Sequence, residues 1–176
     1  MILLTVLVLT SACSEDDEEL KGPLSIRLDL DNYEVETVPL EEKIIFELSS
    51  EELLNEIEEP EKITTVHQTT LYLEETFQRE DSIVVATIGF EYNYKSPVGE
   101  MLSLYQMTEE GIFTNSGVVI TVLDEDETEL DVAKGSGDGE EYEQWVGVQI
   151  PKEVLTENDK ITIEIDGLHI LSYRER

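Results

Sequence analysis

The chain has 176 residues, of which 42 are acidic and 11 are basic, so that its net charge at pH 7 is −31. A field of this sign repels nucleic acids and anionic membrane surfaces, which excludes both as partners of the body of the protein. The same charge attracts divalent cations or a basic protein surface, or keeps the protein soluble in a salty exterior. A single cysteine excludes an internal disulfide framework, and the length suits one domain with a substantial core.

The only cysteine joins an apolar run to an acidic one. The stretch from Ile2 to Leu9 is uncharged and too short to cross a bilayer as a helix, but it has the length of the apolar region of a secretory signal peptide. Small residues from Thr10 to Ala12 precede Cys13, as a signal peptidase requires. A buried N-terminal strand is disfavoured, because the acidic residues that follow leave nothing nearby to cover it.

This junction resembles the signal of a bacterial lipoprotein, with Ala12 and Cys13 matching the end of the lipobox. Thr10 stands where that family usually has leucine, and no lysine or arginine precedes the apolar run, so we expect the true start of translation to lie upstream. The resemblance implies that residues 1–12 are a signal peptide. It also implies that Cys13 becomes the acylated first residue of the mature protein, anchored in a membrane by two or three acyl chains.

The acidic residues after the cysteine resemble the export signal of lipoproteins from Bacteroidota. This resemblance implies a lipid-anchored protein of the outer membrane, displayed at the cell surface. The periplasmic face stays open as an alternative, because an acidic linker also keeps a tether extended. We expect residues 13–23 to form a disordered acidic tether and residues 24–176 to form a single domain. The residues of the export signal are Ser14, Glu15, Asp16, Asp17, Glu18 and Glu19.

From Leu24 onwards, apolar and polar residues alternate in short runs, which is typical of half-buried strands. Ten such runs predict an all-β fold, an antiparallel β-sandwich that resembles immunoglobulin-like domains but lacks the Cys and Trp spacing of true ones. The predicted strands are 24–30, 34–38, 43–48, 63–73, 83–94, 101–107, 117–123, 142–150, 160–165 and 168–173.

Turn and helix signals connect these runs. Asp166-Gly167 predicts a two-residue type I′ turn that pairs the last two strands as a hairpin. Ser49 and Glu52 fit a capping box ahead of a short apolar stripe that ends at Pro60, which predicts one short helix. The glycine-rich stretch 134–139 is predicted to be flexible, and 150–161 to be a loop that crosses between sheets.

No catalytic constellation stands out in the sequence. His67 and His169 lie in predicted strands, and a zinc site would need further nitrogen or sulfur ligands. The sequence contains no Gly-x-Ser-x-Gly nucleophile turn and no phosphate-binding glycine loop. With 42 acidic residues, paired carboxylates occur at any spacing and carry no information about glycoside hydrolysis. We therefore predict that the protein is not an enzyme, with a small hydrolase as a remote alternative.

The most arguable cofactor is calcium, because carboxylate oxygens on a flexible loop suit this ion. The candidate ligands are Asp124, Asp126, Asp131 and Asp138, although their spacing does not fit the EF-hand loop. The alternative is a solvated acidic surface that binds no ion. No other cofactor is indicated.

A second candidate site is aromatic. Phe90, Tyr92 and Tyr94 lie on one face of one predicted strand, where exposed rings would stack on a sugar or serve as a hot spot for a protein partner. The alternative is that these rings fill the core. The sequence thus predicts a lipid-anchored cell-envelope protein of binding or structural role, with an envelope protein or glycan as partner. The alternative is a calcium-dependent module that binds carbohydrate or protein at the surface.

Overall fold

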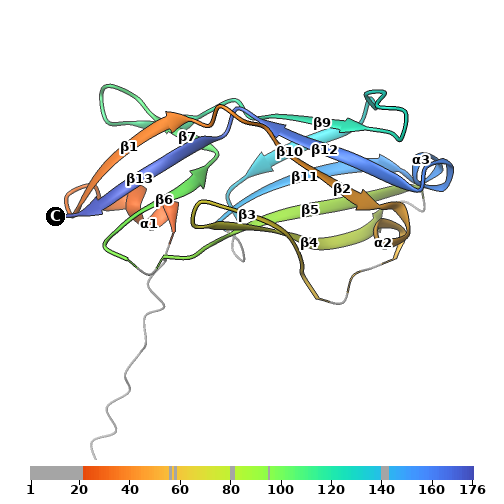
Figure 1. Ribbon diagram of the computed structural model, residues 1–176, viewed down its shortest axis with the longest axis horizontal. Helices are drawn as coiled ribbons and strands as arrows, with labels where there is room; N and C mark the ends of the chain where they lie inside the picture. The colour runs from red at the N-terminus through yellow and green to blue at the C-terminus, as the bar shows by residue number, and fades with distance from the viewer. Residues whose placement is uncertain (1–21, 56, 58, 80–81, 95, 140–142) are drawn as a thin grey trace, which may run out of the picture.

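The computed structural model describes residues 22–55, 57, 59–79, 82–94, 96–139 and 143–176 (Figure 1). These residues form an all-β sandwich in which every described strand pair is antiparallel, as the sequence predicts. The elements are α1 (Pro23–Leu28), β1 (Tyr33–Pro39), β2 (Ile44–Ser49), α2 (Ser50–Leu54), β3 (Glu61–Val66), β4 (Thr69–Arg79), β5 (Ile83–Tyr92), β6 (Val98–Ser103), β7 (Tyr105–Met107), β8 (Phe113–Asn115), β9 (Val119–Leu123), β10 (Ala133–Gly137), β11 (Gln144–Pro151), α3 (Lys152–Glu157), β12 (Lys160–Asp166) and β13 (His169–Glu175).

The main core lies between a five-stranded sheet, in the order β10-β11-β5-β4-β3, and a three-stranded sheet, in the order β2-β12-β9. In each of the central strands every second residue is buried, because successive side chains of a strand point to opposite faces. Ile161, Ile163 and Ile165 of β12, for example, are fully buried between the two sheets. Burial of these side chains is the main stabilising contribution in a chain that has no disulfide.

A second three-stranded sheet, in the order β1-β13-β6, extends the first one beyond the sandwich (Figure 1). The pair β2–β12 ends at Ile44 opposite Ile165, and the pair β1–β13 resumes at Pro39 opposite His169. Between them the Leu40 N–H donates to the Leu168 carbonyl at 2.9 Å, which carries the ladder across the break. The sheets β2-β12-β9 and β1-β13-β6 are therefore two parts of one long, bent sheet, and the bend divides the molecule into two lobes.

This arrangement shows that the predicted hairpin at Asp166-Gly167 is wrong. Strand β12 pairs with β2 and β9, whereas β13 pairs with β1 and β6, so the last two strands never pair with each other. A type I′ turn requires a positive φ at both of its central residues. Gly167 has a φ of +77°, but Asp166 belongs to β12 and does not have a positive φ. The glycine bends a continuing strand instead of reversing it.

The first predicted strand, 24–30, is also wrong, because Pro23 to Leu28 form helix α1. Proline at the first helical position suits the start of a helix. Ile26 is fully buried and Pro23 is buried as well, whereas Leu28 is 74% exposed. Ile26 packs into a second, smaller core beneath β1, β13 and β6, formed with Met101, Leu171 and Tyr173. This tertiary contact decides the conformation over the alternating pattern.

Other boundaries shift for local reasons. The predicted strand 63–73 is the hairpin β3–β4, which reverses at His67-Gln68 with His67 at a φ of +52°. The predicted strand 101–107 is divided into β6 and β7 at Leu104. The stretch 134–139 contains the edge strand β10, and the predicted loop 150–161 contains α3, so that the described residues form three short helices where one was predicted. The capping box of Ser49 and Glu52 is confirmed at the start of α2.

Candidate functional site

The exposed face of the five-stranded sheet carries two aromatic side chains in one cross-strand row. Tyr72 alternates with the buried Leu71 and Leu73 of β4, and Trp145 lies between Gln144 and Val146 of β11, both of which are buried. Each ring therefore lies on the side of the sheet away from the core. The register places Gly137, Trp145, Gly89, Tyr72 and Lys62 side by side across β10, β11, β5, β4 and β3.

The Trp145 ring lies against three glycine positions. A Cβ atom added to Gly137 would lie 3.4 Å from ring atom Cζ2, one added to Gly147 would lie 3.2 Å from Cζ3, and one added to Gly135 would lie 3.9 Å from Cη2. These contacts come from several edges of the indole, so the ring lies over bare backbone of β10 and β11. The indole N–H donates to the Asp138 carbonyl at 3.2 Å and holds its orientation. The ring is half-buried, with one face against the protein.

The positions around these rings are mostly uncharged, which is unusual in a chain of net charge −31. We define the outer face as the residues that the strand register places on the same side as Trp145 and Tyr72. Its charged side chains at paired positions are Glu75, Glu91, Lys62 and Arg79, and Glu74, half-buried in the β-bulge between Leu73 and Glu75, adds a third acid beside them. Besides its glycines, the uncharged polar and apolar residues of the outer face are Thr65, Thr70, Phe77, Ile83, Val85, Thr87, Ala133, Gln149 and Pro151.

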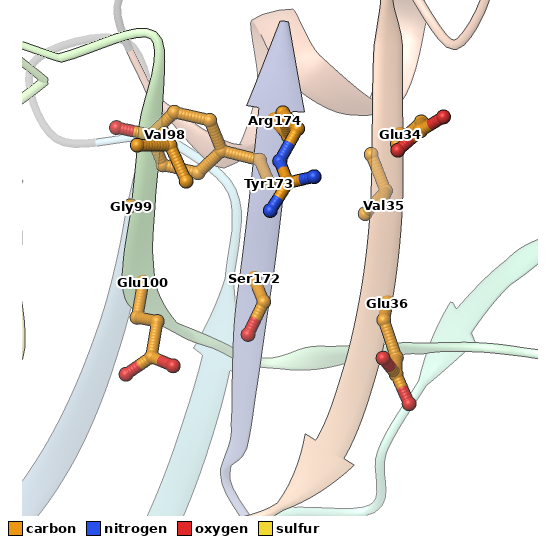
Figure 2. A pocket seen from close by; sticks show the side chains of 9 residues that line it. All are labelled: Glu34, Val35, Glu36, Val98, Gly99, Glu100, Ser172, Tyr173 and Arg174. Carbon is orange, nitrogen blue, oxygen red and sulfur yellow. The ribbon is translucent and has the colours of Figure 1, made fainter.

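A groove of about 500 Å³ lies in the other lobe, on the exposed side of β1, β13 and β6 (Figure 2). Figure 2 shows Arg174 and Ser172 of β13 along its middle, with Glu34 and Glu36 of β1 on one side and Glu100 of β6 on the other. Glu34 is the cross-strand partner of Arg174, and Glu36 and Glu100 are the partners of Ser172. The groove is acidic and open. No three His, Cys, Asp or Glu residues of the described chain group here or elsewhere in a way that could hold a metal ion.

Helices α2 and α3 border a further pocket, of about 600 Å³, at the end of the sandwich farthest from α1 (Figure 1). Its lining is largely polar and includes Asn55, Asn158 and Asp159, with Leu54 and Leu155 as apolar members. The Asn55 and Asn158 amides each donate to a carbonyl of the helix that they follow, at 2.8 and 2.9 Å. Their visible role is to cap two short helices.

A polar cluster holds α1 against the body. The Arg27 guanidinium lies 3.7 Å from the centroid of the Tyr105 ring and 3.7 Å from the Asp138 carboxylate. The Tyr105 hydroxyl donates to the other oxygen of Asp138 at 2.8 Å, and the Leu24 N–H donates to the Glu143 carboxylate at 2.9 Å. Burial raises the pKa of Glu143 above its usual value. This cluster joins the start of the described chain to the sandwich.

The predicted aromatic stripe does not form an exposed platform. Phe90 is fully buried in the main core, and Tyr92 packs between the two cores, where burial raises its pKa well above the usual value. Tyr94 stacks on Tyr173 at a centroid distance of 5.1 Å, and its hydroxyl lies 2.6 Å from that of Tyr33. The rings fill and connect the cores, which is the alternative that the sequence had left open.

The four candidate calcium ligands are not brought together. Asp124 and Asp126 share one turn, in which the Asp124 carboxylate accepts from the N–H groups of Asp126 and Thr128 at 3.0 and 2.8 Å. Asp138 lies beyond the opposite end of β10, in the Arg27 cluster, and Asp131 precedes β10 as an exposed residue. The Asp124 oxygens stabilise a local turn.

The remaining predicted residues occupy separate places. His67 lies in the β3–β4 turn with its Nδ1 3.1 Å from the Glu100 carboxylate, whereas His169 is buried on β13. Cys13 and the export signal, Ser14 to Glu19, lie outside the described residues. Each of the helices in the described ranges lacks the length and hydrophobicity that crossing a bilayer requires.

Sequence reasoning missed the pair Trp145 and Tyr72, although strand periodicity contains the signal. The run Val84, Ala86, Ile88 places even-numbered β5 residues in the core, so Phe90 belongs inside by the same alternation. The same reasoning applied to β4 and β11 places Tyr72 and Trp145 outside.

Comparison with known proteins adds no relationship: no family model, no curated protein and no solved structure matches this chain.

Proposed function

We propose that this protein is a lipid-anchored protein of the bacterial cell envelope, displayed at the cell surface, whose body has a binding role. The single observation that carries the proposal is the junction at Cys13, where an apolar run and small residues meet an acidic run. Acyl chains on that sulfur would contribute about 0.8 kcal/mol for each buried methylene, which suffices for stable anchoring when two or three chains are present. We also propose that the sandwich is related to immunoglobulin-like domains.

The arrangement of the described chain is compatible with a tether at one end. Helix α1, with which the described chain begins, and the C-terminus both lie in the lobe of β1, β13 and β6 (Figure 1). The five-stranded sheet belongs to the other lobe. The start of α1 contacts this sheet at one edge, because the Leu24 N–H donates to Glu143 just before β11, so an anchor ahead of α1 would emerge beside that edge. The half-buried rings of Trp145 and Tyr72, which face away from the core, favour binding over a purely structural role.

Metabolic labelling with a palmitate analogue tests the anchor. The wild-type chain, expressed in a Bacteroidota host, should be labelled and recovered in the outer-membrane fraction. Cys13→Ala should lose both properties, whereas Lys21→Ala, outside the predicted signal, should keep them. Labelling that persists in Cys13→Ala would contradict the proposal.

Protease treatment of intact cells tests surface display separately. Wild type should be digested on intact cells. A variant with Glu15, Asp16 and Asp17 replaced by alanine should stay labelled but become protected. Protection of the labelled wild type would place the protein on the periplasmic face instead.

A further inference from the structure

We infer that the outer face of the five-stranded sheet is a binding site for an uncharged saccharide chain, with Trp145 and Tyr72 as stacking platforms. The inference rests on the proposed binding role and names its ligand class. It commits to residues that differ from the aromatic stripe of β5, whose rings lie inside the protein.

The Trp145 ring is held in place before any ligand arrives. Its contacts with the glycine positions 135, 137 and 147, and its hydrogen bond to the Asp138 carbonyl, fix one face against the sheet. An added Cβ at Gly147 would lie 3.2 Å from the ring, which is a tight contact, so Gly147 allows the ring to lie so close, whereas the distances at Gly137 and Gly135 are ordinary contacts. A ring that is ordered in the free protein loses little conformational entropy when a ligand stacks on it. The apolar C–H face of a pyranose is the group that fits such a surface.

The second ring lies at a spacing that suits a chain rather than a single sugar. Trp145 and Tyr72 share one row and are separated by Gly89 of β5. Neighbouring strands lie about 4.8 Å apart, so the two attachment points are about 10 Å apart. This distance is comparable with the length of a disaccharide unit, so an extended oligosaccharide that crosses the strands would meet both rings.

Hydroxyl and amide groups flank the aromatic row, next to the carboxylates of Glu75 and Glu91. Thr87 lies in the next row on one side, and Thr70 lies on the other side, where its hydroxyl is 3.1 Å from that of Thr65. Gln149 follows one row further along β11. The Tyr72 hydroxyl forms a hydrogen bond with Glu91, which raises its pKa and orients the phenol. Hydroxyl and amide groups of this kind match the hydroxyl groups of a sugar as donors and acceptors.

Charge selects an uncharged occupant. The outer face carries three acids, counting Glu74 in the β4 bulge, against two bases, so it is far less anionic than the whole chain of −31. An anionic polysaccharide would gain no cationic partner beyond Lys62 and Arg79 and would be repelled by the rest of the molecule. A second copy of the chain would bring the same net charge of −31, so face-to-face self-association is opposed as well. A neutral glycan meets neither penalty.

Tryptophan fluorescence provides a direct test, because Trp145 is the only tryptophan of the chain. The purified full-length protein in detergent is titrated with neutral β-linked hexasaccharides of glucose, mannose, galactose and xylose, and with a galacturonic acid hexasaccharide. We expect at least one neutral hexasaccharide to change the emission of Trp145 in a saturable way and the acidic one to have no effect. No change with any of the neutral hexasaccharides, or equal binding of the acidic one, would overturn the inference.

Calorimetry with variants locates the site. Trp145→Ala and Tyr72→Ala should each weaken binding by about tenfold or more, because removal of an aromatic side chain that stacks on a flat ligand has an effect of this size in other proteins. Trp145→Phe should retain part of the affinity, and a circular dichroism melt checks that each variant is folded. Val98→Ala is the matched control, because Val98 is an exposed apolar residue in the groove of Figure 2. Unchanged affinity in folded Trp145→Ala, or a loss confined to Val98→Ala, would refute the site.

The two proposals fail separately. Loss of acylation with intact saccharide binding would remove the anchor and leave this site standing. Intact acylation without saccharide binding would leave the anchor and remove the site.

Discussion

Replacement of Gly167 by alanine tests the bend between the two lobes. Gly167 joins β12 to β13 at a φ of +77°, and an added Cβ would lie 3.4 Å from the Gly117 carbonyl oxygen, which is an ordinary contact. The expected loss is therefore purely one of backbone conformation. A residue with a Cβ atom costs about 1–2 kcal/mol in the left-handed region, offset by about 0.4–1 kcal/mol from a less flexible unfolded chain. We expect Gly167→Ala to lower the free energy of unfolding by about 1 kcal/mol.

Urea unfolding followed by circular dichroism measures this difference, and a thermal melt should show a midpoint lower by about 2–4 °C. Gly135→Ala is the control, because Gly135 is not in the left-handed region and its added Cβ would meet only Trp145, at 3.9 Å. That variant should be as stable as the wild type or slightly more stable. If Gly167→Ala proved as stable as Gly135→Ala, the bend would not depend on a left-handed residue and the reasoning would fail.

Two further predictions concern the core and the α1 contact. Ile163→Ala, at a fully buried β12 position, should lower the free energy of unfolding by about 2–5 kcal/mol in urea melts. Ile45→Ala, at a position 57% exposed on β2, should change it by less than about 0.5 kcal/mol. Equal effects of the two substitutions would contradict the assignment of the sandwich interior. Burial raises the pKa of Glu143 in the folded protein, so its ionisation destabilises the fold as the pH rises from the usual pKa of 4.5 through the raised one. The stability of Glu143→Gln relative to wild type should therefore increase with pH across that interval, and a difference that is independent of pH would show that the carboxyl is not perturbed.

The sequence predicted most strands because their burial is periodic. The alternation of Ile44, Phe46 and Leu48 in β2, or of Val146, Val148 and Ile150 in β11, is a local property that the folded sheet preserves. It failed at Leu24 to Leu30, where the alternation is present but a proline start and one tertiary contact of Ile26 favour a helix. It also missed β10, whose glycines carry no periodic signal and whose pairing with β11 is a long-range event.

For the candidate site, alternation could have assigned Trp145 and Tyr72 to the exposed face, but nothing local indicates that they share a row. That juxtaposition depends on the register of β11, β5 and β4, which is set by packing of the opposite face. The Trp145 ring also lies against glycines of β10, which meets β11 only in the sheet.

By itself the sequence determined the strongly anionic character of the chain, its all-strand class and the start of α2, because composition, alternation and capping act over a few residues. Only the tertiary structure decided that Asp166-Gly167 bends a strand rather than closing a hairpin, and that Phe90 is core while Trp145 is surface. The physical reason is that the same turn residues and the same aromatic rings are compatible with either outcome. The choice is made by the hydrogen-bonded partners and buried neighbours that distant parts of the chain supply.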